Sequence, residues 1–387
     1  MRTVIMNVIK KPVFWVGIAF VFWVYCFRGY LFGKLGFTSD ATSYYEHIRF
    51  FLTNLMSGHF SLWDPYWSGG VPNDFFLRRF CPYNPFYLLI VLFSLAGIPY
   101  YFSYVVFLVC YMFFGMFGFY LITRKLTGDD ISALVAFLLL LFSAVSTRIF
   151  DSYMIFVLTP LLWFFYYLVS FASDPQRKNV LGLAFFAMIT LTTYIPLYFI
   201  VIVLSFLVVF AVLYFDRIAA ISTGLFNFIK RERWLSIFCA VAVLAAVLPG
   251  VMFFQEAGKG SIAIPGRHYN TSESNVLAVQ DQSEDSWAVP EEFFFSAYYH
   301  DLKRITFAIV YMPCFLFIPL VLGFGLRISR LTVLLAVWGG LLLLVTAPFG
   351  SSLYSFLRDK VFIFKYFRNL HFLLWFALLP LLALFVG

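Results

Sequence analysis

Charged residues are scarce in this chain. Asp, Glu, Lys and Arg make up 12% of its 387 residues, whereas 63% are hydrophobic and 22% are aromatic. This composition excludes a water-soluble domain. The alternating pattern of an outer-membrane β-barrel is also absent, and successive apolar runs approach the roughly 20 residues that cross a bilayer as a helix. The sequence therefore predicts an all-α polytopic membrane protein, with residues 1–387 forming a single transmembrane domain.

Cysteine is also scarce, which excludes an internal disulfide. The chain has five cysteines, and only Cys81 falls in a predicted outer loop. One accessible thiol cannot form a bridge within the chain. The other four fall in predicted spans and are Cys26, Cys110, Cys239 and Cys314.

Two further absences narrow the range of substrates and cofactors. No glycine-rich loop of the Walker type is present, which argues against ATP or a nucleotide sugar as the direct substrate. His268 and His300 are isolated, so no metal-ligand set is predicted; no cofactor is expected, and a dependence on a divalent metal is left open. The basic segment FNFIKRERW is interpreted as a contact with anionic membrane lipids and a topology signal, and no nucleic-acid partner is expected.

The apolar runs predict about ten transmembrane helices. The run from 83 to 95 is short and has Pro82, Pro85 and Gly97 around it, so it is either re-entrant or the broken first half of the next span. The run that begins at residue 13 is too long for a signal-peptide core and is expected to be retained. The predicted spans lie near 13–33, 99–123, 131–147, 153–172, 179–194, 196–215, 234–253, 305–325, 331–347 and 369–386.

The distribution of basic residues predicts a cytoplasmic N-terminus in the cell's inner membrane. With that orientation the outer segments are 34–84, 255–304 and 347–368, and the basic residues cluster on the other side. The cytoplasmic basic residues are Arg2, Lys10, Lys11, Arg124, Lys125, Arg177, Lys178, Arg217, Lys230, Arg231, Arg233, Arg327 and Arg330.

The first outer segment begins with an amphipathic stretch, TSDATSYYEHIRFFLTNLMSG. Ser43 and Glu46 have the spacing of a capping box, and Gly58 suits a helix stop, so a helix of about four turns is expected after Asp40. The helix is predicted to lie flat at the outer interface. Its expected apolar face is Tyr45, Ile48, Leu52 and Leu55, and its expected polar face is Glu46, Arg49, Thr53 and Ser57.

The segment that follows, LWDPYWSGGVPNDF, combines interfacial aromatics with turn residues. One interpretation is a structured connector with an aromatic belt. The other is a functional site, because Asp40, Asp64 and Asp74 lie close to a membrane surface where carboxylates are costly to desolvate.

In order and spacing these features resemble the YfhO-like bacterial membrane proteins of the GT-C glycosyltransferase superfamily. The resemblance rests on SGHFSLWDPYWSGGVPNDF followed by CPYNPFYLL, then on SWAVPEEFFFSAYY and YMPCFLFIPL, and on FIFKYFRNLHF before the last span. It covers nearly the whole chain and implies a GT-C-like bundle. Members of that family are usually longer, so a chain that stops at Gly387 is expected to be a truncated product or a shortened relative.

The resemblance implies a role for Asp40 as catalytic base or acceptor-positioning residue, because the superfamily places an acid just after its first span. The competing interpretation is a helix cap. Arg358, Lys365 and Arg368 lie where the positive-inside tendency disfavours them, so they are candidates for binding the lipid phosphate, Arg368 first by resemblance. Snorkelling or pairing with Asp359 would also explain them. Candidates for positioning acceptor or donor are Glu46, Asp64, Arg78, Arg79, Arg148 and Asp151.

The expected function is transfer of a sugar from a polyprenyl-phosphate donor to an extracytoplasmic acceptor: a cell-envelope glycan, a lipid-linked polymer or a protein. Direct attack assisted by one base would invert the anomeric configuration. The segment from 255 to 304 is rich in acids and could cover the donor or acceptor groove. A lipid or glycan transporter, or a non-catalytic envelope assembly partner, are the alternatives.

Overall fold

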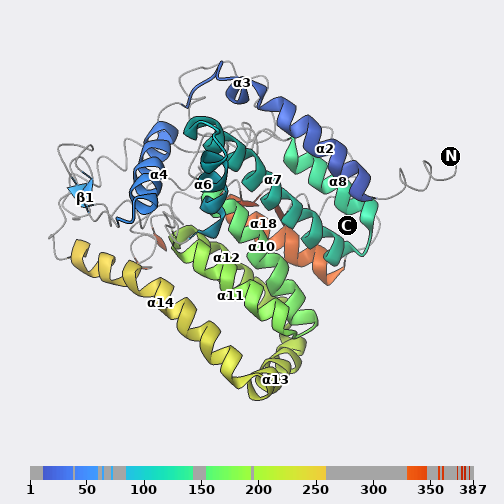
Figure 1. The fold of residues 1–387 in the computed structure, drawn as a ribbon. Coiled ribbons are helices and arrows are strands. Elements are labelled where there is room, and N and C mark those ends of the chain that lie inside the picture. Colours follow the sequence, from blue (N-terminus) through green and yellow to red (C-terminus); the bar gives the residue numbers. More distant parts are fainter. Residues whose placement is uncertain are drawn as a thin grey trace, which may run out of the picture. The chain divides into compact units, whose positions relative to one another are not determined.

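A computed structural model describes residues 12–37, 40–59, 63–64, 71–72, 84–142, 154–192, 196–258 and 329–346, with isolated residues between 356 and 383. The described chain is mostly helical (Figure 1) and divides into two compact units, which we describe one at a time. Within the described residues, two helices are long and apolar enough to cross a membrane, or three if one bent helix pair is a single span.

The first unit is built around the long helix α7 (Tyr100–Thr127), whose 28 residues include both aromatic and small side chains. Helix α10 (Met154–Ser173) packs against α7 and against α11 (Arg177–Leu191). The other elements of this unit are α2 (Pro12–Cys26), α3 (Arg28–Leu31), α4 (Asp40–Met56), β1 (Trp63–Asp64), β2 (Val71–Pro72), η1 (Pro85–Tyr87), α6 (Leu88–Leu95), α8 (Asp130–Leu141) and the first part of α14 (Arg233–Gly258).

Glycine lets α7 and α10 approach each other closely. A Cβ atom at Gly115 would lie 2.6 Å from Oγ1 and 2.9 Å from Cα of Thr159. The Thr159 hydroxyl donates to the carbonyl of Tyr111 at 3.2 Å, and the Trp163 indole donates to the carbonyl of Phe114 at 2.9 Å. Small residues at the contact and polar side chains that bond across it are typical of helix pairs in membranes.

Helix α2 joins α7 through Trp23, which has no exposed surface and donates its indole hydrogen to the carbonyl of Val109 at 3.1 Å. Other apolar side chains of α2 are turned outward: Val13 is 78% exposed and Val21 is 68% exposed. An apolar outer surface on a helix that is anchored to its neighbour by a buried tryptophan suits contact with lipid.

The second unit contains α12 (Pro196–Leu213), most of α13 (Phe215–Arg231), the end of α14 and α18 (Arg330–Thr346). Trp338 of α18 donates to Ser205 at 3.1 Å, and Arg330 binds Asp216. Position 338 thus meets position 205, whereas the earlier position 330 meets the later position 216. Helix α18 therefore runs antiparallel to α12. The chain turns by 114° between α12 and α13 (Figure 1).

Most predicted spans coincide with helices, although a ten-span bundle goes beyond what these residues show. The spans predicted near 99–123 and 153–172 are α7 and α10, the two helices of membrane-crossing length. The spans predicted near 305–325 and 369–386 lie outside the described residues, apart from isolated positions in the second. Helices α2, α8, α11, α12, α14 and α18 occupy the remaining predicted spans, with shorter bounds in several cases.

Candidate functional site

Helix α4 begins at Asp40, as the sequence predicted, and ends at Met56. Gly58 follows with φ of 76°, and the amide of His59 donates to the carbonyl of Asn54 at 2.9 Å. This left-handed stop is favoured by glycine, which has no Cβ to clash. Ser43 lies inside α4, so the prediction that Ser43 caps its start was wrong.

The buried face of α4 is rotated from the predicted one. Ile48 and Leu52 are 1% and 2% exposed, as expected, whereas Leu55 is 46% exposed because it lies in the last turn. The remaining buried residues are Ala41, Tyr44, His47 and Phe51. The four residues predicted to be polar and outward, Glu46, Arg49, Thr53 and Ser57, are all exposed.

Position 40 is the first residue of α4. It is four, seven and eleven residues before Tyr44, His47 and Phe51, which are all buried. Residues at these spacings fall on one side of an α-helix. The first turn of a helix also favours a negative charge, because the free amide groups and the helix dipole point toward it. The backbone therefore places an acid at the start of α4, in helical register with three buried residues.

An aromatic cluster holds α4 against the first turns of α7. The ring centroid of Tyr45 lies 5.4 Å from that of Tyr100 and 5.3 Å from that of Tyr104, and the Phe37 ring lies 5.8 Å away. Edge and tilted contacts of this kind add to the burial of apolar area. Burial raises the pKa of the Tyr45 phenol above its ordinary value, so this side chain stays neutral near pH 7.

The position of α4 along α7 separates it from the basic residues. Tyr100 is the first residue of α7, and Arg124 and Lys125 lie in its last turn. A helix of 28 residues is about 42 Å long at 1.5 Å per residue, enough to cross a bilayer. Within this unit, α4 therefore lies at the end of α7 remote from Arg124, as a helix on the opposite side of a membrane would.

Helix α6 folds back along α7. The Ser94 hydroxyl lies 3.4 Å from that of Ser103, the rings of Tyr87 and Phe107 are 5.5 Å apart, and the Asn84 amide donates to the Tyr111 hydroxyl at 3.3 Å. Residues earlier in the chain before α7 thus contact residues later along α7, so α6 and α7 are antiparallel. The interpretation of 83 to 95 as the first half of the next span was wrong, and the re-entrant alternative fits this hairpin.

Asn84 is a buried polar residue of this hairpin that the sequence analysis did not predict to be a site residue. It is 3% exposed, and its carbonyl oxygen accepts from the Phe86 amide at 3.1 Å, which caps η1. Its partner Tyr111 lies roughly 16 Å along α7 from the helix start, at 1.5 Å per residue. The first predicted outer loop therefore ends deep along α7, and the Asn-Pro pair was the signal for a buried cap.

The other predicted site residues are mostly outside the described residues. Glu46 is described, is exposed, and lies 4.0 Å from Arg49 on the same helix, an ion pair worth little in water. The backbone of Asp64 pairs with that of Val71 in the small hairpin of β1 and β2. The roles predicted for the remaining candidates stay predictions, because these residues lie outside the part of the chain that the structure describes: Arg78, Arg79, Arg148, Asp151, Arg358, Lys365 and Arg368.

Residues predicted to be cytoplasmic are found paired with one another. In the first unit, Arg177 Nε lies 2.9 Å from Glu232 Oε1, and Arg231 donates to the carbonyl of Pro175 at 3.2 Å. Arg124 pairs with Asp130 in the same unit. In the second unit, Arg330 lies 2.8 and 2.7 Å from the two oxygens of Asp216. These contacts agree with the predicted grouping of the connecting segments on one side.

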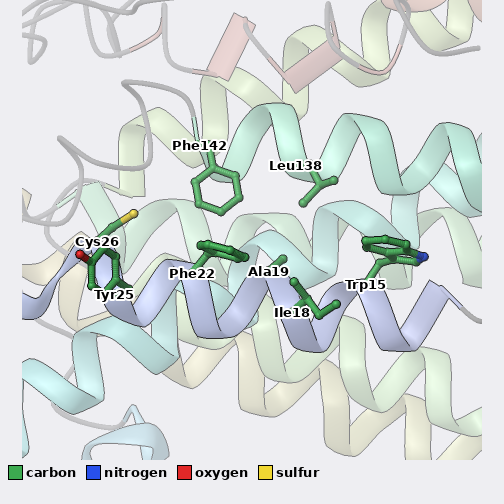
Figure 2. A pocket seen from close by; sticks show the side chains of 8 residues that line it. All are labelled: Trp15, Ile18, Ala19, Phe22, Tyr25, Cys26, Leu138 and Phe142. Carbon is green, nitrogen blue, oxygen red and sulfur yellow. The ribbon is translucent and has the colours of Figure 1, made fainter. Parts of the chain in front are cut away.

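An apolar groove lies elsewhere in the first unit. The groove of about 340 Å³ runs between α2 and α8, with Trp15 at one end and Tyr25 and Cys26 at the other (Figure 2). Phe22 and Phe142 lie on its opposite walls. A hydrocarbon chain would suit such a lining, but it offers no acid or base for proton transfer. Among the described residues, no three His, Cys, Asp or Glu side chains gather as metal ligands would.

Comparison with known proteins does not place the chain in a family. No family model matches it, and no curated protein matches it. The likeness to YfhO-like proteins therefore stays a prediction based on the order of the quoted motifs, and the functional argument depends on the residues themselves.

Proposed function

We propose that this protein is a membrane glycosyltransferase that moves a sugar from a polyprenyl-phosphate donor to an acceptor outside the cytoplasm. The observation that carries the proposal is the place of Asp40: it is the first residue of α4, a helix that packs through buried Tyr44 and His47. An acid at the first turn of a packed interfacial helix suits a reaction between a lipid-borne sugar and a water-borne acceptor.

The chemical step needs one base and one anion-binding group. The Asp40 carboxylate removes the proton of the acceptor hydroxyl as its oxygen bonds to the anomeric carbon of the donor. The bond from that carbon to the phosphate oxygen breaks at the same time, and polyprenyl phosphate leaves with the electron pair. Attack from the face opposite the leaving group inverts the anomeric centre. A positioned carboxylate of this kind contributes about 10²–10⁴-fold to such a rate.

Arg368 is the residue that we propose binds the leaving phosphate. Lys365 and Arg358, which lie shortly before it in the sequence, are proposed to assist. An arginine can grip a phosphate with two parallel hydrogen bonds and stabilise the charge that develops there. Support for this assignment is the presence of a basic segment just before a predicted span, where the positive-inside tendency disfavours it. Glu46, Asp64, Arg78, Arg79, Arg148 and Asp151 are the candidates for positioning donor and acceptor.

The proposal includes the wider arrangement. The chain forms a GT-C-like bundle of about ten transmembrane helices in the cell's inner membrane, with a cytoplasmic N-terminus and the site on the outer side. No cofactor is assigned. The partners are the lipid-linked sugar, the surrounding membrane lipids and a glycan, lipid-linked or protein acceptor.

The decisive assay follows radiolabelled sugar from polyprenyl-phosphate donors to endogenous acceptors in membrane vesicles. Asp40→Asn is expected to reduce transfer by about 10²-fold or more, because the amide cannot accept the proton. The matched control is Asp129→Asn: Asp129 also stands at a helix start, where it accepts from the Ser132 amide at 2.7 Å, and asparagine caps as well as aspartate does. Equal transfer by Asp40→Asn and Asp129→Asn would contradict the assignment.

A transporter or flippase of lipid-linked glycans is the second candidate, and the α6–α7 hairpin favours it. Short apolar helices interrupted by Pro and Gly often mark substrate sites in transporters, and buried Asn84 lies at such a break. The product separates the two candidates. A transferase forms a new glycosidic bond to the acceptor, whereas a flippase exposes an intact lipid-linked sugar on the other leaflet of a sealed vesicle.

A further inference from the structure

Helix α13 has two sharply different faces. Along its 17 residues, the apolar side chains recur at spacings of three and four: Ile218, Ile221, Leu225, Phe228 and Ile229. The opposite side carries Thr223, Asn227, Lys230 and Arg231, and Arg217 borders the apolar face near the start of the helix. Such a division is typical of a helix at a boundary between an apolar and an aqueous phase.

The direction of α13 is the second observation. It follows α12 after a bend of 114°, and α12 is apolar throughout. If α12 lies across the bilayer, a helix at nearly a right angle to it runs along the bilayer surface. Trp234, just after α13, is 80% exposed, and exposed tryptophan is typical of the level of the lipid head groups.

Protein covers the apolar face of α13 unevenly: among the described residues, Ile218 and Ile221 are half-buried, whereas others are exposed. Phe228 is 3% exposed and meets Phe171 of α10, with ring centroids 5.4 Å apart. Phe215, Leu225 and Ile229 are 79%, 42% and 41% exposed. Apolar side chains exposed in a row on one helix mark a surface that something else covers.

The charges around α13 indicate what covers it. The segment from 215 to 233 holds four basic residues, Arg217, Lys230, Arg231 and Arg233, and two acids, Asp216 and Glu232. Asp216 pairs with Arg330 of another segment, and Glu232 pairs with Arg177 of another segment and with the neighbouring Arg231. An excess of positive charge beside an apolar face complements a bilayer surface that carries anionic head groups.

We propose that α13 is an interfacial helix that docks on an anionic lipid surface. Its apolar face, with Leu225 and Ile229, enters the boundary of the acyl chains, and its basic residues contact the head-group phosphates. A second copy of the chain would also be attracted to an apolar face, but the basic excess favours lipid over an equally basic copy. The inference holds for a transferase and for a transporter, so its test is separate from the transfer assay.

Full-length protein in vesicles would test the proposal through a single environment-sensitive fluorophore. The probe is placed by Leu225→Cys on the apolar face, and the matched control is Asn227→Cys, two residues further on the polar face, in a background whose five native cysteines are replaced by serine. Vesicles contain phosphatidylcholine alone or with a third of phosphatidylglycerol. An unchanged thermal unfolding midpoint shows that each labelled variant is folded.

The proposal predicts that brominated acyl chains quench the probe at 225 several-fold more than the probe at 227, whereas iodide in water does the reverse. Phosphatidylglycerol is expected to increase quenching at 225, and high salt to reduce that increase by screening. Iodide access to 225 equal to that at 227 would overturn the docking. A probe shielded from both quenchers would overturn the lipid occupant in favour of a protein one. Equal quenching in both lipid mixtures would overturn the anionic preference.

Discussion

Helices α4 and α13 each have 17 residues and are amphipathic, but their apolar faces are covered differently. On α4, Ile48 and Leu52 are 1% and 2% exposed. On α13, Phe215 and Leu225 are 79% and 42% exposed. The same helical spacing of apolar residues thus occurs in a helix whose apolar face is buried against protein and in a helix whose apolar face is partly exposed. The period predicts the helix, while the neighbouring side chains decide what covers it.

The residues around each helix explain the difference. Tyr100, Tyr101 and Tyr104 at the start of α7 offer α4 an aromatic surface. Helix α13 is flanked instead by basic residues and by α12 and α14, whose own apolar side chains are widely exposed. The proposed function places the chemistry at the start of α4, and the proposed docking places the exposed face of α13 at a lipid surface.

The largest expected contrast in stability comes from one isoleucine on each helix. Ile48→Ala is predicted to lower the free energy of unfolding by about 2–5 kcal/mol, because it leaves a cavity under α4. Ile229→Ala removes the same atoms from a side chain that is 41% exposed and is expected to change it by less than about 1 kcal/mol. Denaturant unfolding in detergent measures both. Equal losses would mean that α13 is packed as tightly as α4.

A smaller effect is expected at the end of α4. Gly58 has φ of 76°, and an alanine there is strained by roughly 1–2 kcal/mol. Gly58→Ala should therefore lower the thermal unfolding midpoint, whereas Gly36→Ala, where no atom lies within 4 Å of an added Cβ, should leave it nearly unchanged. If both variants unfold like the parent protein, α4 does not end in the left-handed stop.

The smallest effect is expected at the start of α13. Hydrogen bonds from the Arg330 guanidinium hold the pKa of Asp216 below its ordinary value of 3.8. The charged form is thus favoured in the folded protein, so the pair stabilises it above that value and the stabilisation is lost as the pH falls through the lowered pKa. Asp216→Asn should lower the unfolding midpoint slightly at pH 7, and the difference from the parent protein should shrink as the pH falls below 3.8. A difference that stays constant or grows on acidification would contradict this account.

The sequence predicted the presence of these elements better than their faces. Hydrophobic runs indicated α7 and α10, and Gly58 indicated the end of α4, because composition and turn chemistry act locally. The faces could not be predicted in the same way. The burial of His47 depends on where α4 meets α7, and the burial of Asn84 depends on the fold-back of α6; both are contacts between segments distant in sequence.

The site itself could be predicted only in part. An acid just after the first apolar run was visible in the sequence, and the helix does begin at Asp40. Its partners could not be derived from spacing, because Arg368 belongs to a segment more than three hundred residues later and no local pattern links the two. The proposed function therefore depends on experiments that act on Asp40 directly.

The proposal places Asp40 outside the cytoplasm, whereas the basic residues of the segment 215–233 predict a cytoplasmic position for that segment. A pair of single cysteines tests these two placements most directly. Thr53→Cys on α4 and Asn227→Cys on α13 are both at exposed positions, in the background without native cysteines. A membrane-impermeant maleimide applied to intact cells should label position 53 at once and position 227 only after the inner membrane is permeabilised. Labelling of both positions from the same side would contradict the account.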